Sequence, residues 1–176
     1  SFIKNIKEFE ASTNYCINYD LKIKKSTYWK INYKPSFNKE NDIYEQTLSL
    51  LCDSLKIRMR SDVPLAFCMS GGVDSTSLVC LANKYLNKSV KTFSVIDSDK
   101  RYDEKKNIDI TTNYLNCNNS LIKTTNLNFF DNLKRITEYY NSPVPTISYY
   151  IHNQLIEKIR EQGFLVSVSG TGADEI

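Results

Sequence analysis

The residues best suited to chemistry lie in one short stretch, Ser70–Ser75, which reads SGGVDS. An apolar run of strand length, Leu65–Met69, precedes it, and residues 78–86 repeat apolar side chains at helical spacing. A strand, a glycine-rich turn and a helix in this order form an anion site, because backbone N–H groups and the helix dipole face the ligand. The glycines let the backbone come close, and the serines add hydroxyl donors. Asp74 would repel a bare phosphate, so we expect Mg²⁺ between its carboxylate and phosphate oxygens.

The type of phosphate loop follows from the residues after the glycines. A Walker A loop requires GxxxxGK[ST], and no lysine follows here. The stretch instead resembles the SGGxDS loop (PP-loop) of ATP pyrophosphatases, which cleave ATP between the α and β phosphates and hold the leaving pyrophosphate in this turn. The structural alternative is an ordinary strand-to-helix turn in which Asp74 and Ser75 only cap the helix.

A second glycine cluster follows another apolar run and reads SGTGADEI, residues 169–176. Four of the five glycines fall in the two clusters, and Gly163 is placed where a helix should end. Ligands in open α/β sheets bind outside the carboxyl ends of strands. If the first and fourth strands are neighbours, Asp74 and Asp174 could therefore face one metal–phosphate group. Taken alone, the second cluster could also be a structural turn.

The remaining pattern predicts alternating strands and helices. Strands are expected at about 65–69, 90–96, 120–124 and 164–168. Helices are expected at about 42–60, 74–86, 103–114, 129–140 and from 147 onwards, with Asp103 and Thr146 as N-caps. This order predicts an α/β fold with a parallel sheet and helices on both faces. Two short strands at 14–19 and 21–25 form a β ribbon before it, followed by a linker at 35–41.

Composition excludes several classes of protein. With 176 residues, 41% hydrophobic and 24% charged, the chain has the make-up of a soluble globular protein. A net charge of +3 is too small to argue for nucleic acid, and no apolar run is long enough for a membrane span. The five cysteines have no metal-binding spacing, which favours reduced thiols in the cytoplasm. His152, the single histidine, is expected on a helix surface or in the core rather than as a ligand.

The two clusters, with TFSV and YDE between them, resemble the synthetase domain of asparagine synthetases. That domain is a PP-loop member of the adenine nucleotide α-hydrolase group. Residues 1–35 resemble the tail of the preceding glutaminase domain, where a ribbon leads to a Tyr-Trp pair, and residues 36–176 resemble the ATP-binding domain. Because the chain starts without Met, we expect it to be a piece of something longer. The resemblance implies that ATP adenylates a carboxylate, pyrophosphate leaves, and ammonia from glutamine attacks the acyl-adenylate in asparagine biosynthesis.

Matched residue by residue, the resemblance also implies individual roles. Pyrophosphate would be held by Ser70, Gly71, Gly72, Asp74 and Ser75. Mg²⁺ would be held by Asp74 and Asp174, and the nucleotide would be lined by Met69, Val95, Ser169 and Gly170. Asp74 and Thr171 occupy the positions assigned to catalysis.

Two departures from the family bear on activity. The family usually has Glu or Asp where Thr171 stands, and threonine is no general base near neutral pH. The sequence stops at Ile176, before the family's catalytic lysine, and lacks the glutaminase cysteine nucleophile, so we expect these residues to be inactive alone.

The sequence therefore predicts an ATP-dependent ligase of asparagine synthetase type. Its partners would be ATP, Mg²⁺, a glutaminase domain and a small carboxylate, either aspartate or a sugar- or amino-acid-like acid. We expect a cytoplasmic protein, with a homodimer among the assemblies to test and neither nucleic acid nor membrane as partner. The alternatives are another PP-loop ATP pyrophosphatase, such as a tRNA-modifying enzyme, and a degenerate domain that binds nucleotide without turnover.

Overall fold

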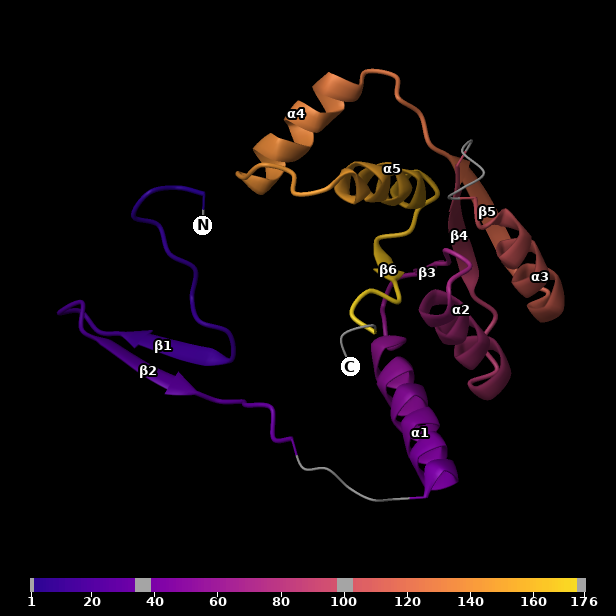
Figure 1. Ribbon diagram of the computed structural model, residues 1–176, viewed down its shortest axis with the longest axis horizontal. Coiled ribbons are helices and arrows are strands. Elements are labelled where there is room, and N and C mark those ends of the chain that lie inside the picture. Colours follow the sequence, from indigo (N-terminus) through magenta and orange to yellow (C-terminus); the bar gives the residue numbers. More distant parts are fainter. Residues whose placement is uncertain (1, 34–38, 98–102, 174–176) are drawn as a thin grey trace. The chain divides into compact units, whose positions relative to one another are not determined.

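The computed structural model describes residues 2–33, 39–97 and 103–173. The chain divides into two compact units, Ser1–Glu40 and Asn41–Ile176 (Figure 1). Each unit is described by itself. All five cysteines are free thiols. None of the helices in the described ranges is long and apolar enough to cross a membrane.

The first unit contains a two-stranded antiparallel ribbon, β1 (Thr13–Ile17) and β2 (Ile23–Thr27). The ribbon was expected, but its strands lie one to two residues away from the predicted bounds. The predicted strands leave only one residue between them, but the observed turn is wider. Asn18 N–H donates to the Lys22 carbonyl at 3.2 Å, and the Asn18 side chain accepts from Lys22 N–H at 2.8 Å. An ion pair between Lys25 and Glu10 lies beside the ribbon and lowers the pKa of Glu10.

The second unit is built on a four-stranded, wholly parallel sheet in the order β5-β4-β3-β6. Its strands are β3 (Leu65–Cys68), β4 (Lys91–Ile96), β5 (Asn118–Lys123) and β6 (Val166–Val168). Its helices are α1 (Glu40–Arg58), α2 (Val73–Cys80) with the π-helix η1 (Leu81–Tyr85), α3 (Lys105–Leu115), α4 (Phe129–Tyr140) and α5 (Ile147–Glu161). The predicted order of strands and helices is confirmed.

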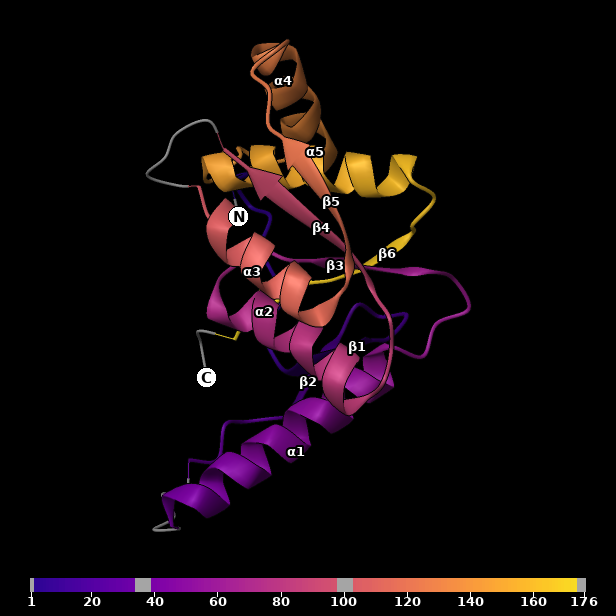
Figure 2. The same cartoon turned by 90° about the vertical axis from the view of Figure 1, so that its right-hand side faces the viewer.

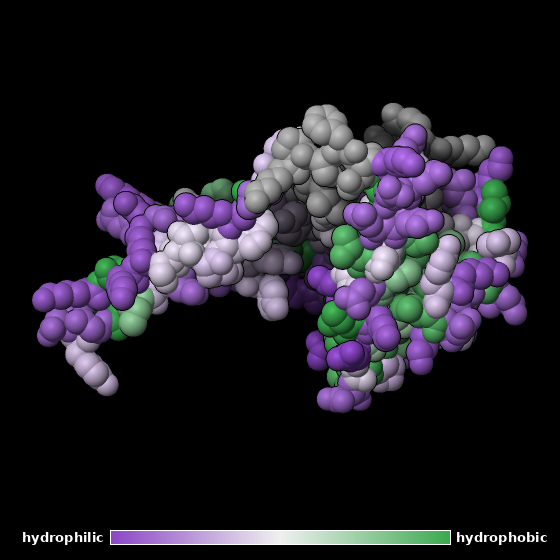
Figure 3. Space-filling view, turned by 90° about the horizontal axis from the view of Figure 1, so that it is seen from below, coloured by the Kyte–Doolittle hydropathy of each residue, from purple (hydrophilic) through white to green (hydrophobic). Residues whose placement is uncertain are grey.

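Alternating side chains of β3 divide the apolar core between the two faces of the sheet. Phe67 and Met69 pack with α1, α2 and α3, whereas Ala66 packs with Phe93 of β4 and with Leu155 of α5. Figures 1 and 2 show α2 and α3 on one side of the sheet and α5 on the other. The expectation of helices on both faces is therefore confirmed. Over the surface seen in Figure 3, hydrophobic residues lie in small groups among hydrophilic ones.

Two local expectations need correction, and a third is confirmed in position only. β5 begins at Asn118, before the predicted start, because the Asn119 side chain accepts hydrogen bonds from Thr92 and Ser94 of β4 at 2.9 and 3.1 Å. The N-cap of α3 is Glu104 rather than Asp103, although the Asp103 carboxylate accepts from Lys105 N–H at 3.1 Å. Thr146 is the N-cap of α5 by position, but its side chain makes no capping hydrogen bond.

Strand order determines where a ligand can enter the sheet. The chain runs from β3 outward to β4 and β5, then returns through α4 and α5 to place β6 on the other side of β3. The direction of winding therefore reverses between β3 and β6. In open parallel sheets, ligands bind at such a switch point, outside the carboxyl ends of the strands. Both glycine clusters follow these two strands directly.

Candidate functional site

The loop after β3 is closed by hydrogen bonds between its own serines. Ser75 Oγ accepts from Ser70 N–H at 3.1 Å and lies 3.0 Å from Ser70 Oγ. Ser75 Oγ also donates to the Gly72 carbonyl at 3.3 Å, while Gly72 N–H donates to Ser70 Oγ at 3.3 Å. If Ser70 Oγ donates to Ser75 Oγ, one cyclic arrangement satisfies all four bonds. Both hydroxyl protons then have acceptors inside the loop, as do the N–H groups of Ser70 and Gly72, so a ligand there would chiefly meet the N–H groups of the first turn of α2.

The helix that follows the loop begins earlier than a cap at Asp74 or Ser75 would require. Gly72 is the N-cap of α2, and Asp74 lies within its first turn. The N–H groups of a first helical turn have no acceptor inside the helix, and the dipole gives that end a partial positive charge. The first turn of α2 therefore has the polarity that an anion requires. The N-cap is therefore Gly72 rather than Asp74 or Ser75, and no side chain makes a capping hydrogen bond there.

The two glycines of the loop differ in backbone conformation and surroundings. Gly71 has φ +90°, and a Cβ there would lie 3.2 Å from Asn107, Glu104 and Ile108 of the α3 region. Gly72 has an ordinary φ of −73°, and its nearest neighbour would be the Ser70 hydroxyl at 3.3 Å. Gly71 thus packs against the start of α3, whereas Gly72 lines the cavity described next.

The second glycine cluster packs directly on the first. A Cβ on Gly170 would lie 2.8 Å from Ser75 N, 2.9 Å from Asp74 Cβ and 3.1 Å from the Asp74 carbonyl carbon. β6 pairs with β3 in parallel, with Val168 opposite Phe67. The expectation that the first and fourth strands are neighbours is therefore confirmed. Ser169 Oγ donates to Thr171 Oγ1 at 3.1 Å within the second turn.

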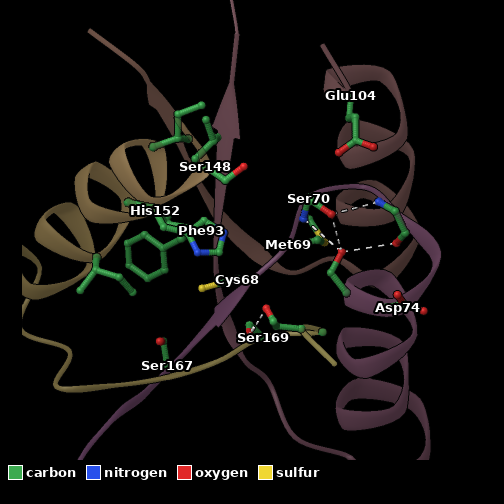
Figure 4. Close-up of a pocket in the computed structure, with 18 of the residues that line it drawn as sticks. Cys68, Met69, Ser70, Asp74, Phe93, Glu104, Ser148, His152, Ser167 and Ser169 are labelled. Carbon is green, nitrogen blue, oxygen red and sulfur yellow. Dashed lines mark hydrogen bonds between the residues drawn. The ribbon is translucent and has the colours of Figure 1, made fainter. Parts of the chain in front are cut away.

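A cavity of about 770 Å³ opens where these segments meet (Figure 4). The structure brings most of the predicted site residues to its wall: Met69, Ser70, Gly72, Asp74, Ser75, Val95, Ser169, Gly170 and Thr171. Gly71 is not among the lining residues. Asp174, predicted as a metal ligand, lies outside the described residues. The binding roles of all these residues stay predictions.

The cavity also has walls that sequence reasoning missed. Glu104 and Asp97 contribute carboxylates near the ends of α3 and β4, and Phe93 lies beneath the cavity. His152 lines it from α5, although the sequence favoured a plain surface or core histidine. Its side chain is indeed exposed, but on the cavity side of the helix. Ser148 and Ile156 lie one helical turn before and after His152, so the sequence spacing could have shown that the three residues share one face of the helix.

Cys68 lines the same cavity from the end of β3. Burial raises the pKa of its thiol, and a hydrogen bond with Ser167 opposes that shift. A raised pKa leaves less thiolate near neutral pH, so Cys68 is a weak nucleophile there. Cys68 therefore contributes to the cavity wall by packing against the apolar cluster around Phe93.

Comparison with known proteins assigns the family. A family model described as asparagine synthase matches residues 46–176. The chain belongs to the asparagine synthase family. Across its whole length it is 32% identical to a protein of Methanocaldococcus jannaschii named "Putative asparagine synthetase [glutamine-hydrolyzing] 2", and it covers 34% of that protein. Over 98% of the chain it is 28% identical to asparagine synthetase [glutamine-hydrolyzing] 1 of Bacillus subtilis, covering 27% of that protein.

The chain therefore spans about a third or less of the curated asparagine synthetases that it matches. Among solved structures, an NH3-dependent NAD synthetase from Campylobacter jejuni aligns with a TM-score of 0.46 and 17% identity. That alignment covers 70% of this chain and 55% of the other.

The donor set of this asparagine synthase domain fits Mg²⁺. Mg²⁺ is usually bound through one or two carboxylates together with phosphate oxygens, and Asp74 supplies a carboxylate on the cavity wall. Within the described ranges, no three His, Cys, Asp or Glu side chains cluster as a metal site. A cation shared with a phosphate ligand does not need such a cluster.

Proposed function

We propose that this chain forms the ATP site of an asparagine-synthetase-type ligase. In this proposal ATP activates a carboxylate as an acyl-adenylate with release of pyrophosphate, and ammonia derived from glutamine then forms the amide. The family assignment supports a ligase of this type. The observation that carries the proposal is the close approach of Gly170 to Asp74 and Ser75, which joins the two motifs at one cavity.

The loop after β3 is the proposed pyrophosphate site. The first turn of α2, which follows the loop directly, stabilises negative charge, and this charge increases on the leaving pyrophosphate as the bond to the α phosphate breaks. The closed hydrogen-bond cycle of Ser70 and Ser75 fixes the loop, and with it the first turn of α2, before the ligand arrives. Preorganised donors of this kind need little rearrangement during the reaction.

Asp74 is the proposed ligand for Mg²⁺, together with Asp174. Bound Mg²⁺ supplies charge neutralisation at the phosphate oxygens. Asp74 holds its carboxylate beside the loop because it lies in the first turn of α2, under the backbone of Gly170. The nucleotide would then extend past Met69, Val95, Ser169 and Gly170, all of which line the cavity.

Thr171 bears on the acceptor. Thr171 lines the cavity, and its hydroxyl oxygen already accepts a hydrogen bond from Ser169, so it orients the turn rather than removing a proton. An acceptor other than aspartate, such as a sugar acid or an amino-acid-like acid, is therefore included in the proposal. Thr171 is also the observation that favours the second candidate, a domain that binds nucleotide without turnover.

The nature of the products tests the proposal. The full natural chain is incubated with ATP, Mg²⁺, ammonia and a panel of small carboxylic acids, and nucleotides are separated by chromatography. We expect AMP and pyrophosphate, formed only when the right acid is present. Production of ADP and phosphate would contradict the pyrophosphatase assignment. Tight ATP binding with no AMP for any acid would favour the second candidate.

Residues 1–35 are proposed as the tail of a glutaminase-like domain. The support is the β ribbon followed by Tyr28 and Trp29, in a unit separate from the sheet. The glutaminase site of the full natural chain is blocked, and AMP formation is measured with glutamine and with free ammonia. Loss of activity with glutamine and retention of activity with ammonia would support two separate domains. Loss of ammonia-dependent activity on the same treatment would contradict it.

A further inference from the structure

One wall of the cavity is a stripe along α5. Ser148, Ile151, His152, Leu155 and Ile156 all line it, and they repeat every three to four residues. This spacing places them on one face of the helix. His152 is exposed, whereas Leu155 is buried against the sheet. The imidazole is therefore available to a ligand in the cavity.

The position of this stripe is fixed by contacts away from the cavity. Leu155 and Ile159 pack with Phe93 and Ala66 on the sheet. The Gln154 side chain makes two hydrogen bonds to the backbone of Thr125, each 3.0 Å long. Helix α5 is thus held in place by side chains that neighbour His152. The core contacts and hydrogen bonds described for this helix do not involve His152 itself.

The two ends of the cavity differ in chemistry. At the loop end lie the first turn of α2, Asp74 and Glu104. Glu104 is close to the loop, because its carbonyl oxygen would be 3.2 Å from a Cβ on Gly71. The α5 end carries aliphatic side chains, a hydroxyl and one imidazole. Figure 4 shows Ser70 and Asp74 on one side and His152 with Ser148 on the other, and Cys68 lies between them.

We propose that His152 binds the purine base of the nucleotide, a role that rests on the proposed function. A nucleoside triphosphate has a polyanionic end and a neutral, flat aromatic end. With the phosphates at the α2 end, the base is directed to the α5 wall, whose lining side chains include no carboxylate; the remaining lining carboxylate, Asp97, follows β4. Histidine is one of the side chains on which bases stack, and its ring nitrogens can also make a hydrogen bond. Ile151 and Ile156 flank it with apolar surface.

Calorimetric titration of the full natural chain with two probes tests this role. ATP and inorganic tripolyphosphate, each with Mg²⁺, share the phosphate chain and differ in the base and ribose. His152→Ala should weaken ATP binding about ten-fold and leave tripolyphosphate binding unchanged, because only stacking is lost. His152→Phe should keep most of the ATP affinity, since it retains a flat ring.

Lys158→Ala is the matched control, because Lys158 is exposed on α5 and does not line the cavity. It should bind both probes like the wild type. The role of His152 is overturned if His152→Ala binds ATP normally, if it loses both probes equally, or if His152→Phe is as weak as His152→Ala. A wild-type chain that binds neither probe would instead refute the proposed ATP site itself.

Discussion

A methyl group added at Gly170 should separate the two motifs that form the cavity. The new Cβ would lie 2.8 Å from Ser75 N and 2.9 Å from Asp74 Cβ, whereas ordinary contact begins at 3.4 Å. The shortfall is 3.4 − 2.8 = 0.6 Å. The opposing atoms belong to the first turn of α2 and its closed loop, which have little freedom to yield. The second turn must therefore retreat by about this amount.

Two measurable effects follow for Gly170→Ala. Overpacking of this kind costs about 1–3 kcal/mol of unfolding free energy, which for a chain of this size lowers the melting temperature by about 2–12 °C. Catalysis, measured on the full natural chain, should fall more. A misplacement of about 1 Å can cost a hundred-fold in rate, so a shift of just over half that should reduce acid-dependent AMP formation about ten-fold.

Gly163→Ala is the control that separates stability from function. Gly163 has φ +86°, so alanine there is strained by about 1–2 kcal/mol, yet nothing lies within 4 Å of the new Cβ. Gly163 does not line the cavity. We expect a similar loss of melting temperature with unchanged AMP formation. Equal activity in the two variants would refute the argument that close approach of Gly170 positions the site.

Three further predictions concern single side chains. Asp74→Asn should reduce pyrophosphate release about 10²-fold while the melting temperature stays within a few degrees, because one charge is lost and the shape is kept; unchanged release would remove Asp74 from the mechanism. Cys68, whose thiol pKa is raised by burial, should be alkylated by iodoacetamide more slowly at pH 8 than the exposed Cys16, with a rate that rises at higher pH; equal labelling by mass spectrometry would contradict this. Thr76→Val should raise the melting temperature by a few degrees, since Thr76 Oγ1 is buried without a partner in the described structure; a fall would show that the hydroxyl is satisfied.

The local part of the site could be predicted because its cause is local. The strand before Ser70, the glycine turn and the start of α2 depend on neighbours in sequence, and the predicted order of elements is correct. The pairing of β6 with β3 is a different matter. From the sequence, this pairing could only be assumed, because the order of strands in a sheet depends on the path that each crossover connection takes.

His152 shows where the sequence pattern stops being informative. The apolar spacing of Ile151, Leu155 and Ile159 correctly identified a helix packed on the sheet. The spacing did not show that His152, which lies at the edge of this apolar stripe next to Ile151, faces the cavity at the carboxyl ends of the strands. The capping of α3 failed for a simpler reason: Asp103 and Glu104 are adjacent acidic residues, and the backbone conformation selects between them.

The packing of Gly71 against α3 has a consequence for how such loops change during evolution. Its backbone conformation and the nearness of Asn107, Glu104 and Ile108 demand glycine whether or not a phosphate ever binds. A descendant that lost catalysis would still be held to glycine at this position by the stability of its fold. Asp74 lies in the first turn of α2, where the backbone conformation does not require aspartate. The acidic residue of the motif is therefore the better record of whether selection still maintains the chemistry.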